Sequence, residues 1–319
     1  MKLRKIYDEA VKKGKENDPR SLKEIDYILK ERKAAFNKLD PKEKRFFDVE
    51  SLTNPYSDTR ILWGDQNAEI KSAIVGIDIE GPELLLIDSL RKSGTKIDLA
   101  LAHHPEGHAF ANFYETMDVQ IDVFAQTGMN LAAAQNLLAE RRSQVERRVS
   151  AANHQRTIDI ARLLDINFLC MHTVCDNLAY QYMNTTMKQK KPKTIADVLA
   201  ILFDIPEYQY AAKINNPPKI FIGSRNSRVA KIHFEFTGGT EGPQDIYDKL
   251  SAQGVDTIVA MHQSEDHYQR CKKANINVVV ASHIASDNVG VNLMLDHLLR
   301  KDKVTIHEFS GFTRVARKR

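Results

Sequence analysis

Histidines follow four separate apolar runs in this chain of 319 residues. The runs cover 98–102, 167–171, 257–261 and 277–282, and the histidines after them are His103 with His104, His172, His262 and His283. Each run has the length of a buried strand, lacks the alternation of a half-exposed strand, and follows an amphipathic helical stretch. Because ligands of open α/β sheets bind beyond the carboxyl ends of the strands, this pattern predicts a metal site at such an edge.

Two of these histidines are followed by an aspartate four residues later. The pairs are His172 with Asp176 and His283 with Asp287. At this spacing on a helical turn, both side chains project from one face and can reach a common ion. Mixed imidazole and carboxylate ligands suit Zn, Mn or Fe rather than Ca or Mg.

His103 and His104 are adjacent, which constrains how they bind a metal. Neighbouring residues of a regular strand point in opposite directions, so one ion cannot take both side chains in that geometry. Two ions could each take one histidine, or a single ion could take both if the chain bends there. Pro105 favours extended backbone at His104 and ends the strand. The pair therefore adds to the predicted metal site and leaves the number of ions open.

Two further motifs are weaker candidates. His262 and His267 are five residues apart, a spacing that does not place both on one helical face, so we interpret them as lining or structural residues. The stretch Phe236–Pro243 is a glycine-rich turn that could present backbone N–H groups to an anion. It lacks the spacing of a P-loop or a dinucleotide fingerprint, which favours a plain tight turn.

The composition is that of an ordinary globular protein, with 42% hydrophobic and 28% charged residues. No apolar run is long enough to span a bilayer, and the three cysteines form no CxxC motif, so we expect a cytoplasmic protein without a membrane partner. The net charge is +4, and two basic runs occur at 188–193 and 314–319. Because such runs are commonly solvated surface, a nucleic-acid partner is not expected.

The periodicity predicts α/β architecture with two related lobes, layered sheets flanked by helices, and a helical N-terminal extension. The expected domains are the extension 1–55, a first lobe 56–190 completed by 286–319, and a second lobe 191–285. Strands are expected at 70–78 and 98–102, and helices at 82–93 and 194–203. One long helix or two helices should fill 129–165. A weak internal repeat between 80–94 and 241–254, each followed by a strand and a histidine, supports two lobes.

Five segments, taken together and in order, resemble the NIF-three-like (NGG-one-interacting factor) family, whose members are commonly called GTP cyclohydrolase I type 2 homologues. They are 63–71 (WGDQNAEIK), the strand to Asp78, 101–105 (LAHHP), 172–176 (HTVCD) and 282–287 (SHIASD). The resemblance covers about residue 58 to the C-terminus. It implies two α/β lobes with a dinuclear metal centre between them, often in toroidal hexamers. The implied metal ligands are His103, His104, Asp176, His283 and Asp287, where Asp287 replaces the family's usual, longer Glu.

The resemblance and the ligand types imply two divalent transition-metal ions per chain, either Zn, Mn or Fe. Our first hypothesis is a metal-dependent hydrolase of a nucleotide or phosphoester, in the cyclohydrolase case opening the imidazole ring of a purine nucleotide. His172 or His262 would then be the catalytic residue that shuttles protons, and the sequence leaves that choice open. The alternative is a non-catalytic metal-binding assembly or interaction protein. The expected partners are a small-molecule substrate and further copies of the chain.

Overall fold

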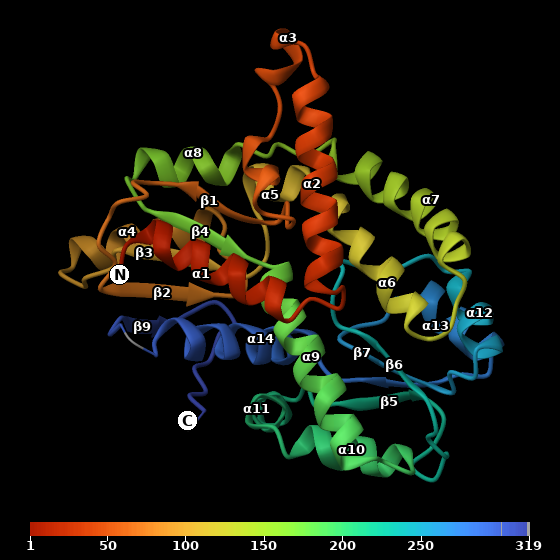
Figure 1. Cartoon of the computed structure of the whole chain (residues 1–319). Helices are drawn as coiled ribbons and strands as arrows, with labels where there is room; N and C mark the ends of the chain where they lie inside the picture. The colour runs from red at the N-terminus through yellow and green to blue at the C-terminus, as the bar shows by residue number, and fades with distance from the viewer. Residues whose placement is uncertain (301, 318–319) are drawn as a thin grey trace.

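The computed structural model describes residues 1–300 and 302–317, and it contains two sheets with helices between and outside them (Figure 1). The first sheet has the strand order β1-β4-β3-β2-β9, and the second has the order β5-β8-β7-β6. The strands of the first sheet are β1 (Thr59–Trp63), β2 (Ser72–Gly76), β3 (Leu99–Ala102), β4 (Phe168–Met171) and β9 (Thr305–Glu308). Those of the second sheet are β5 (Lys219–Ile222), β6 (Ile232–Glu235), β7 (Thr257–Ala260) and β8 (Asn277–Val280).

The second sheet repeats the first strand for strand, apart from the added β9. In both sheets the first strand is antiparallel to its neighbour, and the next three strands are parallel to one another. The antiparallel strand has an irregular register in both, between Ile61 and Trp63 in β1 and between Ile220 and Ile222 in β5. The weak repeat in the sequence therefore corresponds to two lobes of the same topology.

The same side-chain hydrogen bonds brace corresponding loops of the two lobes. Asp98 accepts hydrogen bonds from backbone N–H groups at the start of β2, and Asp256 does so just before β6. Asn167 donates to the carbonyl of Asp98, and Asn277 donates to the carbonyl of Asp256. These hydrogen bonds tie the loops of each lobe together, so the four residues help to fix where each parallel strand begins.

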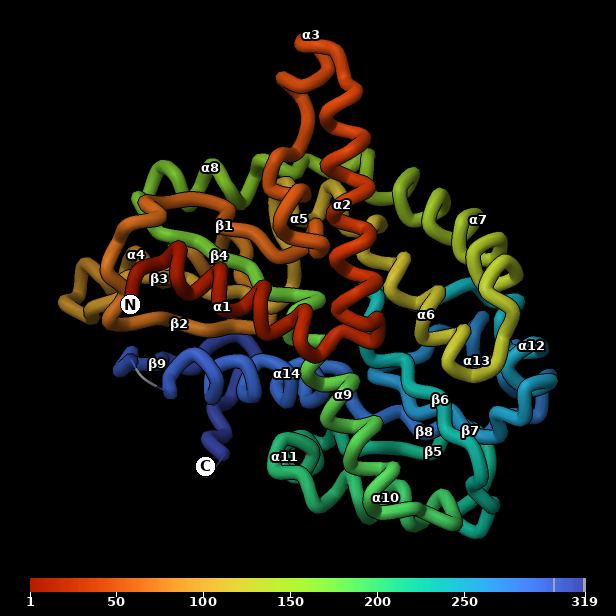
Figure 2. Tube along the Cα trace, viewed as in Figure 1, coloured from red at the N-terminus to blue at the C-terminus, as the bar shows by residue number. Residues whose placement is uncertain are grey.

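The helices lie in layers around the two sheets (Figure 2). Most of them are α-helices, and two short segments, η1 (Val49–Leu52) and η2 (Phe113–Asp118), are 3₁₀-helices. The helices before the second lobe are α1 (Leu3–Glu16), α2 (Leu22–Lys38), α3 (Pro41–Lys44), α4 (Gly81–Lys92), α5 (Gly107–Ala111), α6 (Val119–Ala125), α7 (Leu131–Val149), α8 (Arg156–Leu163) and α9 (Thr173–Lys190). The remaining ones are α10 (Ile195–Phe203), α11 (Pro206–Lys213), α12 (Ile246–Ala252), α13 (Glu265–Lys273) and α14 (His283–Leu298).

Helices α9 and α14 form the layer between the two sheets. Both contribute buried side chains to the core of the first sheet and to the core of the second. Helices α4 and α8 cover the outer face of the first sheet, and α12 and α13 cover the outer face of the second. A Cβ at Gly290 of α14 would lie 2.4 Å from the carbonyl oxygen of Cys175 in α9, so glycine permits their close approach.

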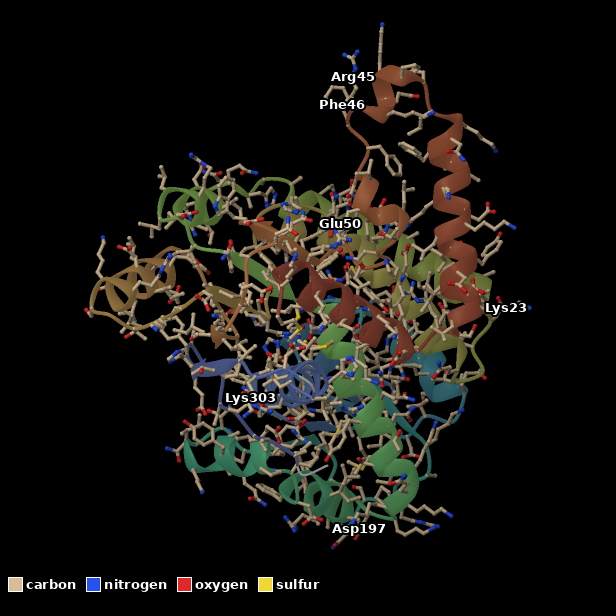
Figure 3. All side chains as sticks on the ribbon, turned by 60° about the vertical axis from the view of Figure 1, so that its left-hand side comes forward. Lys23, Arg45, Phe46, Glu50, Asp197 and Lys303 are labelled. Carbon is tan, nitrogen blue, oxygen red and sulfur yellow. The ribbon has the colours of Figure 1, made fainter. Side chains whose placement is uncertain are left out.

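The N-terminal region is helical, and part of it projects from the body. Helix α1 packs on the first sheet, where Leu3 and Ile6 join its core. Ser21 accepts a hydrogen bond from the backbone N–H of Glu24 at the start of α2. Farther along, α2 and α3 form an arm that stands clear of both sheets, with Arg45 and Phe46 near its tip (Figure 3). Phe46 is 89% exposed, so no other residue that the structure describes covers its side chain.

The expected fold class is confirmed: two mixed sheets flanked by helices follow a helical N-terminal region. The stretch 129–165 contains two helices, α7 and α8, because the chain turns between Ser150 and Gln155. The domain boundaries remain a prediction, and the last two residues of the basic tail 314–319 lie outside the described residues. None of the described helices combines the length and apolar character that crossing a bilayer requires.

Candidate metal centre

The predicted ligands come together where β3 ends and where α9 and α14 begin. His103 and His104 follow β3, Asp176 lies in the first turn of α9, and His283 and Asp287 lie in the first turns of α14. Because both helices lie between the two sheets, the cluster is at the junction of the lobes. The sequence-predicted metal ligands are thus neighbours in space, although up to 184 residues of chain separate them (287 minus 103).

The backbone bends after β3, and this bend lets His103 and His104 share one site. The carbonyl of Ile77 accepts hydrogen bonds from the backbone N–H groups of both residues, at 3.2 and 2.9 Å, so the regular ladder stops there. Their ring centroids are only 5.2 Å apart. Of the geometries that the sequence leaves open, the structure therefore has a bent chain with the two side chains close together.

Three overlapping groups of side chains could each hold a metal ion. Within each group, one donor atom per residue lies within 4.8 Å of the others. The groups are His103-His104-His172, His104-His283-Asp287 and His103-Asp176-Asp287. The last two share Asp287 and together contain all five predicted ligands.

Buried polar atoms in the cluster lack hydrogen-bond partners. They are Nε2 of His103 and both carboxylate oxygens of Asp287. His103 Nε2 lies 3.3 Å from the nearer oxygen of Asp176 and 3.6 Å from that of Asp287, without hydrogen-bond geometry. Buried carboxylate and imidazole groups without partners are costly unless an ion satisfies them. The donor set present thus fits divalent transition metals.

Hydrogen bonds on the far side of each ring orient three histidines toward the cluster. The Nδ1–H of His103 donates to the carbonyl oxygen of Met171 at 3.1 Å, and that of His104 donates to Asp78 at 2.6 Å. The Nδ1–H of His172 donates to Asp58 at 2.8 Å. These bonds leave Nε2 as the atom that faces the cluster, the arrangement that metal-binding histidines usually have.

Asp58 is the most buried of the supporting carboxylates. Besides His172, its Oδ2 accepts hydrogen bonds from the hydroxyl and the backbone N–H of Thr173, at 2.6 and 3.3 Å. It therefore fixes both the ring of His172 and the start of α9. His172 Nε2 lies 3.7 Å from Asp176, so this histidine stands beside the cluster with its orientation set.

The carboxylates shift the protonation of the histidines around them. Burial lowers the pKa of His104, but the nearby carboxylates of Asp287 and Asp78 outweigh burial and raise it to about 9. Burial lowers the pKa of His103 as well, but the carboxylates of Asp287 and Asp176 outweigh burial and raise it. Burial dominates at His283 and lowers its pKa to about 4 despite Asp287. For Asp287, the two histidines overcome burial and hold its pKa far below the ordinary range.

The second lobe provides the opposite wall of a narrow cavity beside the cluster. His172, Asp176, His283 and Asp287 line this cavity on one side. On the other side are residues of β6, His262, and most of the glycine-rich turn 236–243, which includes Glu241. The turn therefore forms a wall of the candidate site, although its sequence favours an ordinary tight turn.

His262 and His267 have different environments. His262 has a side chain that is 46% exposed, lies 4.7 Å from the His283 ring centroid to centroid, and is 3.9 Å from Glu241. His267 is buried and hydrogen-bonded to the hydroxyl of Tyr247 at 2.6 Å. As expected for five-residue spacing, they do not share a helix face, since His262 precedes α13 and His267 lies within it.

Sequence reasoning missed three carboxylates that support the site. All three lie in loops next to a helix or a strand, and none stands at a helical spacing from a histidine; they are Asp58, Asp78 and Glu241. The four-residue spacing that identifies Asp176 and Asp287 exists only within a helix. Nothing local in the sequence marks the other three, because their partners are 21 to 114 residues away (262 minus 241; 172 minus 58).

The structure is similar to solved structures of NIF3 proteins. A NIF3 superfamily protein from Sphaerobacter thermophilus has 26% sequence identity and a TM-score of 0.69, over 80% of this chain and 92% of that chain. Reduced HcgD from Methanocaldococcus jannaschii has 15% identity and a TM-score of 0.43, over 84% and 94%. A Bacillus cereus protein related to NIF3 has 10% identity and a TM-score of 0.42, over 81% and 92%. No protein-family model and no curated protein matches the chain.

Proposed function

We propose, from the premise that this chain is a NIF3-like protein, that it binds two divalent transition-metal ions and hydrolyses a nucleotide or another phosphoester. One ion would be held by His103, Asp176 and Asp287, and the other by His104, His283 and Asp287. The observation that carries this proposal is the set of buried donor atoms without partners, Nε2 of His103 and both oxygens of Asp287. Zn, Mn and Fe all suit such a ligand set.

When bound, such ions supply Lewis acidity and lower the pKa of water, which is the chemistry that hydrolysis of a phosphoester needs. The chain's own contribution would be proton transfer and exclusion of water. His172 faces the cavity with its Nδ1–H fixed on Asp58, so its Nε2 is placed to accept or donate a proton. His262 lines the same cavity from the second lobe, beside Glu241, and is the other candidate.

In its specific form, the proposal is that the substrate resembles that of GTP cyclohydrolase I type 2. It would be a purine nucleotide whose imidazole ring is opened. The size of the cavity is consistent with only part of a substrate entering between the lobes, since its open space is about 60 Å³.

The alternative function is a metal-binding assembly protein without turnover, and the projecting arm favours it. Phe46, near the tip of the arm, is 89% exposed, and an exposed large apolar residue at such a place is typical of contact surfaces. We propose that the chain forms homo-oligomers in either case, of hexameric form by the family resemblance. The cytoplasm is the proposed location, because the three cysteines are free and buried.

A substrate screen combined with metal removal tests the hydrolase. Purified protein would be assayed with nucleotides, GTP among them, and with simple phosphoesters, with Mn or Zn added back after chelation. We expect turnover that Asp176→Ala abolishes and that His108→Ala, a change at an exposed histidine outside the cluster, leaves intact. Metal binding without turnover across the screen would favour the assembly protein instead.

A further inference from the structure

A second and larger cavity lies beside the free edge of β6. It has about 1010 Å³ of open space, against about 60 Å³ for the cavity at the metal cluster. Its walls come from the end of α6, the second half of α9, the loop after α9, and the chain from Arg228 to Phe234. We call this cavity the basic groove. Its volume is at the upper end of the range for small-molecule sites, about 300–1,000 Å³.

The charge of the basic groove has one sign. Five cationic side chains line it, and none of the lining residues is acidic. These five residues are Lys188, Lys191, Lys193, Arg228 and Lys231. No ion pair joins any of them to an acidic side chain among the residues that the structure describes. A cleft lined by one sign of charge focuses its field and concentrates ions of the opposite sign.

Helix capping explains only part of this charge. Lys188 lies in the last turn of α9 and Lys191 caps that helix, where cations complement the helix dipole. Arg228 and Lys231 come from another segment, just before β6. The amine of Lys231 is fixed by the carbonyl oxygens of Thr127 and Gln253, at 2.8 and 2.9 Å. The fold therefore gathers cations from separate segments around one space.

The floor of the basic groove contains the ring of a buried histidine. His233 is 4% exposed and stacks on Phe124 with 5.6 Å between ring centroids, and its ring makes no hydrogen bond to another residue that the structure describes. Burial lowers the pKa of His233 to about 4, so at neutral pH the uncharged ring has one N–H donor to offer. His233 also lines the cavity at the metal cluster, so the two cavities adjoin there.

The free edge of β6 adds backbone donors. The carbonyls of Lys231 and Glu235 accept hydrogen bonds from Thr257 and Met261, on the side of β7. Since the hydrogen-bonding groups of a strand alternate between its edges, the N–H groups of Ile232 and Phe234 face away from β7. Phosphate oxygens accept hydrogen bonds from cationic side chains and from free backbone N–H groups, and the basic groove offers both.

We propose that the basic groove binds a phosphate-rich anion of nucleotide size, separately from the metal ions. Its phosphates would lie among the lysines and Arg228, and the remainder would reach toward His233. The source can be a nucleoside triphosphate or an inorganic polyphosphate, which share this chemistry. This site goes beyond the proposed hydrolase and stands without it, because its residues belong to no metal-binding group.

Calorimetric titration of the chelated, metal-free protein tests the proposal. The probes are inorganic tripolyphosphate and ATP, titrated into wild type and into the variant Lys188→Glu, Lys191→Glu, Arg228→Glu. A hydrogen bond to a charged group contributes about 1.5–3 kcal/mol, so losing two such contacts should weaken binding by about 100-fold or more. ATP binding tighter than tripolyphosphate would assign a nucleotide, and the reverse order would assign a polyphosphate.

A matched control carries the same change of charge on the arm. It is Lys23→Glu, Lys42→Glu, Arg45→Glu, at exposed positions of α2, of α3 and directly after α3, and Figure 3 labels Lys23 and Arg45. The control should bind both probes like wild type, as should His103→Ala, His104→Ala. The proposal is overturned if wild type binds neither probe, if the arm control weakens binding equally, or if the histidine variant loses binding. Binding of an acidic peptide or a single-stranded oligonucleotide in place of both probes would also overturn it.

Discussion

The two lobes have the same strand order, but the carboxyl edges of their sheets differ in chemistry. In both, a helix that follows the fourth strand brings a histidine and an aspartate four residues apart: His172 with Asp176 in α9, and His283 with Asp287 in α14. The third strands differ. After β3 come His103 and His104, whereas after β7 comes the buried Met261 before His262.

This difference makes the junction of the lobes asymmetric. The first lobe contributes both strand-end histidines and the carboxylates that orient its histidines, Asp58 and Asp78. Helix α14, which follows the last strand of the second sheet, contributes Asp287, whose carboxylate lies 3.6 Å from His103 and from His104. The second lobe adds a wall with Glu241 and the glycine-rich turn. The comparison teaches that one α/β pattern, used twice, can place two histidines at the end of the third strand in one lobe and an apolar residue at the same position in the other.

The largest effect is expected for Asp287→Ala, which removes the one residue shared by both proposed ions. Without its carboxylate, three histidines would face one another, and we expect both ions to be lost. Metal analysis after dialysis measures this directly. His262→Ala, a change in the second lobe outside the metal-binding groups, is the control and should keep two ions. If Asp287→Ala still retained both ions, the shared carboxylate would be excluded.

His103 after β3 and Met261 after β7 occupy equivalent positions, and truncating each should distinguish a metal ligand from a core residue. His103→Ala should abolish the binding of one ion while the fold persists. Met261→Ala should keep both ions but lower the free energy of unfolding by about 2–5 kcal/mol, the usual cost of truncating a buried methionine. Metal content and denaturant unfolding distinguish the two. Equal loss of metal in both variants would contradict the asymmetry between the lobes.

Among the supporting carboxylates, the more buried one should cause the larger loss of metal affinity when it is replaced. Asp58→Asn weakens the orientation of His172 and the start of α9, and we expect activity or metal affinity to fall about 10- to 100-fold. Asp78 is half exposed and holds only His104, so Asp78→Asn should have the smaller effect. Metal titration with a competing chelator would compare the two. The reverse order would show that His104 depends on its support more than His172.

The pH dependence of the metal-free protein should reveal opposite behaviour of histidines from the two lobes. The pKa of His104 is raised to about 9, so its stabilisation is complete below pH 6.5 and is lost as pH rises through 9. The pKa of His283 is lowered to about 4, so its stabilisation is present above pH 6.5 and is lost as pH falls through 4. Thermal unfolding should thus show greatest stability near pH 6.5, with changes of about 2–4 °C per kcal/mol. A Tm that rises steadily from pH 6.5 to 9 would contradict the role of His104.

The smallest effect is expected at His267, which is structural. His267→Gln should leave the metal content unchanged and cost about 1 kcal/mol by loss of the hydrogen bond to Tyr247. Denaturant unfolding together with metal analysis checks this. A loss of metal would place His267 in the site and enlarge the contribution of the second lobe.

The sequence predicted the architecture and the local parts of the site, and the long-range parts required the structure. The spacings of His172–Asp176 and His283–Asp287 are fixed by one helical turn, so they can be read along the chain. That His103 and His104 converge depends on a bend held by the carbonyl of Ile77, which no local pattern specifies. Asp58 and the glycine-rich turn reach the site only through packing of distant segments. Whether 129–165 forms one helix or two likewise depended on a turn that lacks glycine and proline.

The central claim is that one cluster at the junction of the lobes holds two metal ions, and anomalous X-ray diffraction of metal-loaded crystals tests it most directly. The account predicts two anomalous peaks per chain. One should lie between His103, Asp176 and Asp287, and the other between His104, His283 and Asp287. A single peak, no peak, or peaks beside Glu241 and His267 would contradict it.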